Sequence, residues 1–457
     1  MSGVLWLTDR SRYEVGLGKC PRERYLEYHR GPGGYGMRLQ AVSMPQARGI
    51  YIHEGVAILF AHLQAEDALP EEGTIRAAVK AAVDKYTNVV EARGLQNLDA
   101  GQVVETIIKE QCALLTGTIW TLALELLPWW HAEYRVVSVE QEEIAVLGCT
   151  CGLGDLTGNS EDHVARECAG VGWMSRADVI GEHRLTGRLA YFEIKTGGMA
   201  SRAEDWETKI QFSAAVLGVE QRLERPIDES WVLNLLVGKR EGAYNYETKK
   251  KDGPPLQQSI FCYGYKKPAP APGMVDEWAA QYDYQDDQGR NRKLTKDYRK
   301  AGVWEIDPKL TGGLDPAEFW VRWIGPEVRQ QQVSVIGPLN RQAVLLEGFK
   351  EELLAVESDW QGKLWALYDV QTQGHEWGSG EFQSALNALV PRSWACNRFG
   401  QRYQCAFVPI CFKHEGWDDP LGSGRYMLRA PHHQPEREQM LARGIEIPAE
   451  SQNDVED

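Results

Sequence analysis

The chain has 457 residues, of which 43% are hydrophobic and 25% charged, and its 65 acidic and 50 basic side chains give a formal net charge of −15. This composition is typical of soluble globular proteins and excludes collagen-like, coiled-coil and wholly disordered chains. The length suggests about two or three domains, or one enzyme core with large insertions. The acidic balance argues against non-specific coating of nucleic acid.

No membrane span and no secretion signal are expected. The longest apolar candidate, Thr118 to Trp130, carries Glu125 and Pro128, and it falls short of the roughly 18 apolar residues that cross a bilayer. The N-terminus has neither a basic start nor a long apolar stretch with a cleavage site. We therefore expect a cytoplasmic protein, in which nine cysteines indicate metal binding or core packing rather than disulfides.

The N-terminal part, residues 1–133, is predicted to be helical. The spacing of apolar residues predicts a broken helix over 11–30 and a longer one over 45–65. Residues from about 72 to 130 form a further helical region, rich in alanine and leucine.

Residues 134–238 are predicted to be an α/β core. The segment 134–140 is β-branched and alternating, which is typical of a strand. A loop rich in glycine and cysteine follows. After that loop we expect strands over 172–181 and 188–195, a helix over 203–219 and a buried strand over 230–237.

The C-terminal half is less regular. Prolines interrupt residues 239–339, an insertion of unknown role with one predicted strand at 259–266. Residues 340–430 begin with a long helix, 340–367, and continue into a cysteine-rich segment. Residues 431–457 are acidic and are predicted to be a largely disordered tail.

Three charged residues on two neighbouring predicted strands indicate hydrolytic chemistry. Asp178 lies on the first strand, and Glu193 and Lys195 lie on one face of the second. If the strands form a hairpin around 185–188, the two carboxylates converge, and a hard cation such as Mg²⁺ or Mn²⁺ would offset their repulsion. A lysine beside that ion could orient water and stabilise charge on a phosphate. An isolated Glu-x-Lys is common and indicates only a solvated ion pair.

With two further motifs, this arrangement resembles the PD-(D/E)XK nuclease superfamily. The RecB-like exonuclease branch, which includes iron–sulfur CRISPR-adaptation nucleases and AddB-like nucleases, has a Gly-x-x-x-His helix that is similar to Gly49-Ile-Tyr-Ile-His53. Gln211 falls where that branch has a Gln-x-x-x-Tyr motif, but Ala215 replaces the tyrosine and leaves its substrate contact in doubt.

The resemblance implies a restriction-endonuclease-like core, which is a mixed central sheet flanked by helices. It implies that His53, Asp178 and Glu193 bind Mg²⁺ or Mn²⁺. It also implies that Lys195 assists the attacking water and that Gln211 positions the water or the phosphate. Glu54 points about 100° away from His53 on a helix and is therefore a poor co-ligand.

Four cysteines at the two ends of the chain are similar to those of the iron–sulfur members of the branch. Cys20 is N-terminal, while Cys396, Cys405 and Cys411 lie together near the C-terminus. Four thiolates can hold a 4Fe-4S cluster or a zinc ion. The gap between Cys396 and Cys405 is longer than in many members and resembles phage-encoded relatives. The implied cluster would be a structural staple, and four unrelated buried cysteines are the alternative.

The remaining cysteines and the basic segments carry weaker signals. Cys149, Cys151, His163 and Cys168 could bind zinc, but their spacing matches no zinc pattern, so packing or unpaired thiols are the alternative. Cys112 and Cys262 are expected in the core. Phosphates could contact a basic run with nearby aromatic residues, although such a run is usually a solvated face. This set comprises residues 290–300, Lys239, Arg240, Lys249–Lys251, Tyr298 and Trp304.

The resemblance therefore implies a metal-dependent DNA nuclease, a hydrolase that acts as an exonuclease on single-stranded DNA or duplex ends. Recombination, repair or phage DNA processing would be its setting, in the cytoplasm of a bacterium or a phage-infected host, with a helicase or recombination partner. One alternative is a CRISPR-adaptation nuclease that trims spacer precursors. Another is a non-cleaving DNA-end-binding subunit, which the intact Asp178, Glu193 and Lys195 disfavour.

Overall fold

A computed structural model of the chain describes its folded parts. These are residues 5–30, 36–96, 103–149, 170–197, 206, 210–237, 284–285, 291–292, 313–323, 326–330, 332–339, 343–393, 405–413, 419–431, 433–442 and 444. The strand predicted at 259–266 lies outside the described residues.

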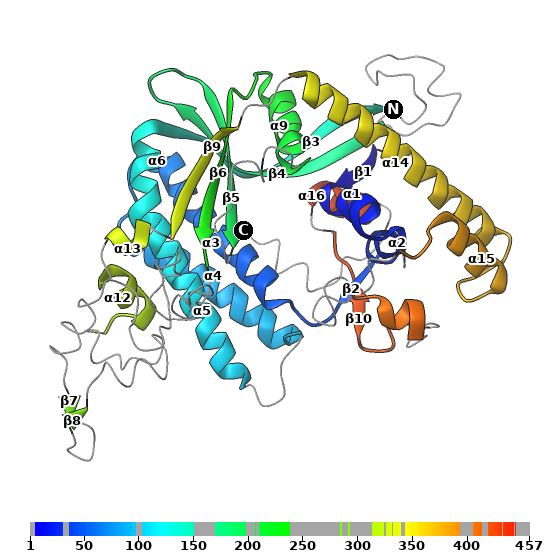
Figure 1. The fold of residues 1–457 in the computed structure, drawn as a ribbon, viewed down its shortest axis with the longest axis horizontal. Helices are drawn as coiled ribbons and strands as arrows, with labels where there is room; N and C mark the ends of the chain where they lie inside the picture. The colour runs from blue at the N-terminus through cyan, green and yellow to red at the C-terminus, as the bar shows by residue number, and fades with distance from the viewer. Residues whose placement is uncertain are drawn as a thin grey trace, which may run out of the picture.

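The chain is an α/β protein with a mixed central sheet flanked by helices (Figure 1). The sheet has six strands in the order β1-β4-β5-β6-β9, and β3 pairs with the other edge of β4. β1 pairs with β4 in parallel, β5 pairs with β6 in parallel, and the other pairings are antiparallel. The strands are β1 (Leu5–Asp9), β3 (Tyr134–Cys149), β4 (Gly170–His183), β5 (Leu189–Gly197), β6 (Glu229–Leu236) and β9 (Val333–Leu339).

One edge of β4 is shared by two strands. Its first part pairs with β1 up to Met174, and its last part pairs with β5 from Val179 onward. Between these pairings, residues 175–178 have no strand partner on that edge in the described part of the chain. Asp178 therefore lies where β5 and β4 separate, at a fork in the sheet.

A helical layer covers one face of the sheet. In α3, buried residues such as Ile52, Val56, Leu59 and Phe60 recur at helical spacing. These side chains share one core with residues of β4, β5 and β6. The layer comprises α3 (Met44–Glu66), α4 (Glu72–Arg93), α5 (Val104–Thr121), η3 (Leu122–Leu126), α6 (Leu127–Glu133), α12 (Pro316–Trp323) and α13 (Pro326–Gln330).

Two helices cover the opposite face. α9 (Ile210–Leu223) and α14 (Ala343–Thr372) pack on side chains that point to this face, such as Tyr191 and Val232. Both helices were predicted from apolar spacing. α9 begins at 210 rather than 203; of the intervening residues only Trp206 is described, and it is helical and buried.

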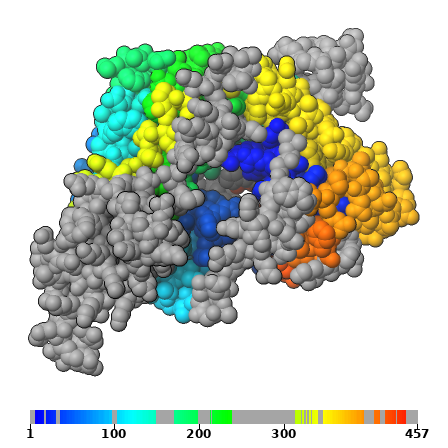
Figure 2. Space-filling model, viewed as in Figure 1, coloured from blue at the N-terminus to red at the C-terminus, as the bar shows by residue number. Residues whose placement is uncertain are grey.

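The two ends of the chain pack together on a third core. Arg22 of α2 donates to the backbone of Leu386 and Val390, at 3.0 and 2.9 Å, and Ser393 donates to the carbonyl of Lys19. Figure 2 shows the orange C-terminal segments beside the dark-blue N-terminal ones. Side chains of α2 (Pro21–Tyr28), β2 (Met37–Leu39), α15 (Gly380–Leu389), η7 (Pro409–Lys413) and β10 (Tyr426–Leu428) belong to this core. The other elements at the two ends are α1 (Arg10–Glu14), η1 (Val15–Lys19) and α16 (Gln434–Ala442).

The tail prediction is wrong for part of residues 431–457, because Gln434–Ala442 forms α16. Glu436 of this helix is buried and forms an ion pair with Arg12, and the amide of Gln434 donates to Glu142 at 2.7 Å. Burial against partners far away in sequence orders a segment that looks polar on its own. β1, β9 and α15 were also not predicted.

One apolar helical stretch is longer than the segment 118–130 identified in the sequence. Val104–Glu133 is long and apolar enough to span a membrane by length and composition, but 72% of its most apolar window is buried inside the protein. Its side chains belong to the helical layer over the sheet. It therefore has the burial of a core helix of a soluble protein.

Asp9 makes the stability of the fold depend on pH in the acidic range. It caps α1 by accepting from the Arg12 amide at 2.9 Å, and only 5% of it is exposed. Burial raises the pKa of Asp9, but Arg12, Arg429 and His433 outweigh it and lower the pKa to about 2. A lowered carboxyl pKa stabilises the fold above the unfolded value near 3.8, and the stabilisation is lost as pH falls toward 2.

We expect Asp9→Asn, which keeps the cap, to lower the free energy of unfolding by about 2 kcal/mol at pH 7. The difference from the wild type should shrink between pH 4 and pH 3. Urea unfolding at pH 7, 4 and 3 measures both effects, and a difference that does not change with pH would contradict the electrostatic explanation.

Candidate metal and catalytic site

Asp178, Glu193 and Lys195 meet at the fork between β4 and β5, as predicted. Their two strands form the expected hairpin, paired up to Val179 and Phe192. Beyond that pair, the Ile194 amide donates to Asp178 Oδ2 at 2.6 Å. The Asp178 carboxylate thus replaces a backbone partner and is fixed against β5.

Glu193 is held from both sides along its own strand. Tyr191, Glu193 and Lys195 occupy every second position of β5 and therefore lie on one face of the strand. Both the Tyr191 hydroxyl and the Lys195 ammonium contact the Glu193 carboxylate. The Glu193 side chain is 1% exposed, whereas that of Lys195 is 25% exposed. The lysine therefore connects a buried carboxylate to the solvent-facing side of the site.

His53 reaches the fork from α3. A Cβ atom added to Gly49, one turn earlier, would lie 3.2 Å from Thr196 Oγ1 at the end of β5. Glycine therefore allows this helix to approach the strand closely. His53 Nδ1 lies 3.6 Å from Asp178 Oδ1, and the adjacent Glu54 forms an ion pair with Lys85 at 3.0 Å instead, as expected from its direction on the helix.

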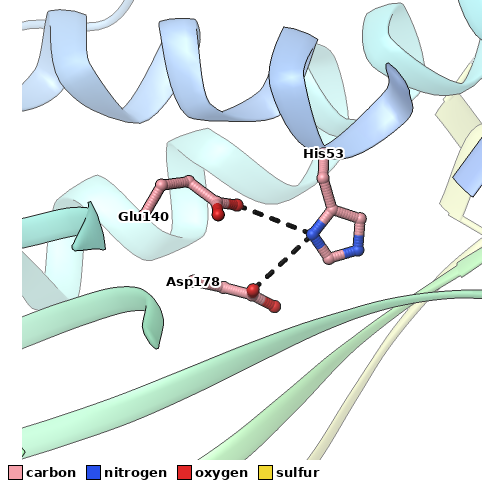
Figure 3. Close-up of side chains that lie close together, drawn as sticks. All are labelled: His53, Glu140 and Asp178. Atoms are coloured by element: carbon pink, nitrogen blue, oxygen red, sulfur yellow. Dashed lines mark ion pairs between the residues drawn. The ribbon is translucent and has the colours of Figure 1, made fainter. Parts of the chain in front are cut away.

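Glu140 completes a group that the sequence analysis missed. Glu140 Oε1 lies 3.6 Å from His53 Nδ1, and one donor atom from each of His53, Glu140 and Asp178 lies within 4.8 Å of the others (Figure 3). It is the only such group of three or more His, Cys, Asp or Glu residues in the described ranges.

The backbone of Glu140 is strained. Its φ angle is +46°, in the left-handed region that residues with a Cβ atom avoid. The flanking pairs, Val139 with Val179 and Gln141 with Ala177, put Glu140 opposite Asp178 across the two strands. Strain of this kind, which costs about 1–3 kcal/mol, is concentrated at functional sites.

The pKa values of three groups in the site, His53, Glu193 and Tyr191, are raised. Burial alone would lower the pKa of His53, but Asp178 and Glu140 outweigh it and raise the pKa to about 10. Burial also raises the pKa of Glu193; Lys195 opposes the shift and Asp178 adds to it. The pKa of Tyr191 is raised by burial and by Glu193, so its hydroxyl stays protonated and donates.

The donor set suits a divalent cation. Two carboxylates and one imidazole converge, and carboxylate oxygens favour Mg²⁺ and Mn²⁺ while a nitrogen donor favours transition metals. Of the three predicted ligands, His53 and Asp178 belong to the group, and Glu193 lies beside it, bound by Tyr191 and Lys195. The third member of the group is Glu140, in place of the predicted Glu193.

Gln211 lies near the beginning of α9, but its side chain is outside the described part of the structure. Ala215, which stands where the resembled motif has tyrosine, is 3% exposed and packs in the core between α9 and the sheet. A tyrosine ring at this position would need space that the core does not leave.

The N- and C-terminal segments that carry Cys20, Cys405 and Cys411 lie close together, but these three described thiols do not form a closed ligand set. Cys20 and Cys411 are buried, and Cys405 is half-buried. Burial lowers the pKa of Arg22, and the thiols of Cys411 and Cys20 both act to raise it, so both lie near one guanidinium. The three thiols do not lie together within the distance of a single ion. Cys396 is outside the described residues.

Several other predicted features also lie outside the described residues. These are the side chain of Cys149, with Cys151, His163 and Cys168, the segments with Lys239, Arg240, Lys249–Lys251 and Cys262, and most of the basic run 290–300 with Tyr298 and Trp304. Cys112 packs against the main core, 3.7 Å from Thr87 Oγ1, as predicted.

No protein-family model matches the chain, and no curated protein matches it. The geometry of the site therefore carries the functional argument.

Replacing Glu140 tests its place in the group. We expect Glu140→Gln to weaken Mn²⁺ binding by at least about tenfold, because it removes one of three charged or basic donors. Isothermal titration calorimetry measures the affinity. Glu182→Gln is the control, since this carboxylate also pairs with an arginine across β3 and β4 and has a similar exposed fraction, 21% against 19%. Equal affinities in the two variants would contradict the assignment.

Proposed function

We propose that the chain is a metal-dependent deoxyribonuclease of the PD-(D/E)XK type with a restriction-endonuclease-like core. The observation that carries the proposal is the meeting of Asp178, Glu193 and Lys195 at the fork, with His53 and Glu140 beside Asp178. Charges gathered in a buried place cost free energy unless they are paired or hold an ion. Such a cluster is therefore better explained by catalysis than by packing.

His53, Glu140 and Asp178 would hold Mg²⁺ or Mn²⁺, with Glu193 next to them. When bound, the ion would supply Lewis acidity toward the scissile phosphate. The two carboxylates fit either ion, and the imidazole makes Mn²⁺ the better match.

Lys195 would act on the water and the phosphate. Its ammonium is positioned by Glu193, which is in turn fixed by Tyr191. The partly exposed ammonium can orient the attacking water and stabilise the negative charge that develops on the phosphate. By the resemblance, Gln211 would help position the water or the phosphate, and DNA ends would be the substrate of an exonuclease.

A 4Fe-4S cluster held by Cys20, Cys396, Cys405 and Cys411 belongs to the same proposal. In a cubane each thiolate binds a different iron, so the thiols need not meet at one point. The contacts of Arg22 and Ser393 already join the segments that carry these cysteines. Anaerobically purified protein should contain about four irons per chain and absorb visible light, and Cys20→Ser should lose both. A colourless, iron-free wild type would contradict the cluster.

The test of the function is degradation of end-labelled single- and double-stranded DNA by anaerobically purified protein with Mn²⁺ or Mg²⁺. We expect shortening from the ends that stops with EDTA and in Asp178→Asn. Asp228→Asn is a matched control, because Asp228 also accepts a β5 amide, that of Leu189 at 2.9 Å, but at the far end of the strand. A wild type that binds DNA and never cuts it with either metal would make the chain a non-cleaving DNA-binding subunit.

A further inference from the structure

An arginine lies directly beside the proposed metal ligands. Arg176 precedes Asp178 by two residues on β4, and its Nε lies 2.9 Å from Glu140 Oε2. The other oxygen of the same carboxylate, Oε1, faces His53. One carboxylate therefore connects the imidazole of the site to a guanidinium.

The charged end of Arg176 is accessible. Its side chain is 37% exposed, whereas those of Asp178 and Glu140 are 10% and 19% exposed. A guanidinium has five N–H donors, and in the described part of the chain the ion pair of Arg176 with Glu140 is closest at Nε. Its two terminal nitrogens can therefore receive a further acceptor from solvent.

The acidic residue across the strand is already engaged elsewhere. Arg176 and Glu142 are paired across β4 and β3. However, Glu142 Oε2 accepts from the Gln434 amide at 2.7 Å, and Oε1 lies 3.4 Å from His433 Nδ1. Gln434 of α16 and the adjacent His433 thus hold Glu142, which acts on Arg176 as a nearby charge. The terminal nitrogens of Arg176 remain open to an external group.

We propose that Arg176 binds a phosphodiester group of the nucleic-acid substrate next to the metal site, held in place by Glu140. The inference rests on the proposed nuclease function and adds a substrate-binding residue to it. A planar guanidinium presents two parallel N–H groups that match two phosphate oxygens, a geometry that an ammonium cannot reproduce. The pairing with Glu140 fixes the orientation of the Arg176 guanidinium before substrate arrives.

The test measures binding of a single-stranded oligonucleotide by fluorescence anisotropy over a range of salt concentrations, with Ca²⁺ in place of Mn²⁺. Arg176→Gln should weaken binding about tenfold or more and reduce the slope of log Kd against log salt by about one. Arg176→Lys should keep most of the slope but bind more weakly than the wild type. It preserves the charge and also covers the case in which Arg176→Gln does not fold.

Arg135→Gln is the control. Arg135 also pairs with a glutamate across β3 and β4, Glu182, but at one end of these strands rather than near their middle, and its side chain is 62% exposed. If Arg176→Gln binds DNA with the affinity and salt slope of Arg135→Gln, while the wild type binds and cuts DNA, the inference alone is overturned. A wild type that neither binds nor cuts DNA would overturn the proposed function, and the role of Arg176 with it.

Discussion

Lys195→Ala is expected to slow Mn²⁺-dependent DNA cleavage by about 10²–10⁴-fold, the range typical for loss of a group that assists proton transfer or stabilises developing charge. Mn²⁺ binding should remain, because the donor group consists of His53, Glu140 and Asp178. The combination of lost cleavage and retained metal binding separates a catalytic lysine from a structural one. Cleavage rates on labelled DNA and calorimetric titration with Mn²⁺ measure the two effects.

The control for this variant is Lys85→Ala. Lys85 forms an ion pair with Glu54 at 3.0 Å, and its side chain is 26% exposed against 25% for Lys195. Lys195→Gln is a second variant, since its amide can still donate to Glu193 and so limits the cost of leaving that carboxylate unpaired. If both Lys195 variants cut DNA at the rate of Lys85→Ala, the catalytic role of Lys195 is refuted.

The largest expected effect on stability comes from a buried ion pair. Arg24 of α2 and Glu357 of α14 both have fully buried side chains, and two hydrogen bonds of 3.0 and 2.6 Å join them. Trp6 also donates to Glu357, and the guanidinium lies over the Trp360 ring. This pair joins the helix that follows Cys20 to the long C-terminal helix.

We expect Glu357→Ala to lower the free energy of unfolding by about 3–5 kcal/mol, because it leaves a buried guanidinium without its counter-charge. Asp359→Ala, on the same helix, removes an exposed pair with Lys363 and should cost at most about 1 kcal/mol. Urea unfolding of both variants measures the difference. Similar losses in the two variants would show that the buried pair does not hold the helices together.

Local patterns predicted the elements that have strong periodicity. The apolar spacing of α3 and the strand patterns at β4 and β5 predicted these elements almost to their ends, and the predicted turn at 185–188 indicated the hairpin that joins the two strands. The same patterns put Asp178, Glu193 and Lys195 close together. These features depend on contacts between neighbours in sequence.

The missed features depend on partners far away in sequence. β1 has five residues and is ordered by its parallel pairing with the beginning of β4. α16 is ordered by Arg12 and Glu142. β1 is short and α16 is polar, so neither segment indicates its structure without these partners.

Glu140 was missed for a related reason. It stands in the acidic run Glu140-Gln141-Glu142-Glu143, and regular alternation does not tell which carboxylate faces His53. The left-handed backbone at Glu140 and its position opposite Asp178 decide this. An acidic run within a strand was the one signal available, because strands disfavour such residues.

The most direct test of the proposed metal centre is anomalous X-ray diffraction from crystals of the protein soaked with Mn²⁺. We expect an anomalous peak between His53 Nδ1 and the carboxylates of Glu140 and Asp178. In Glu140→Gln the peak should be lost or markedly weaker. Mn²⁺ bound only elsewhere on the protein, with no peak at the fork between β4 and β5, would contradict the metal centre and the nuclease that depends on it.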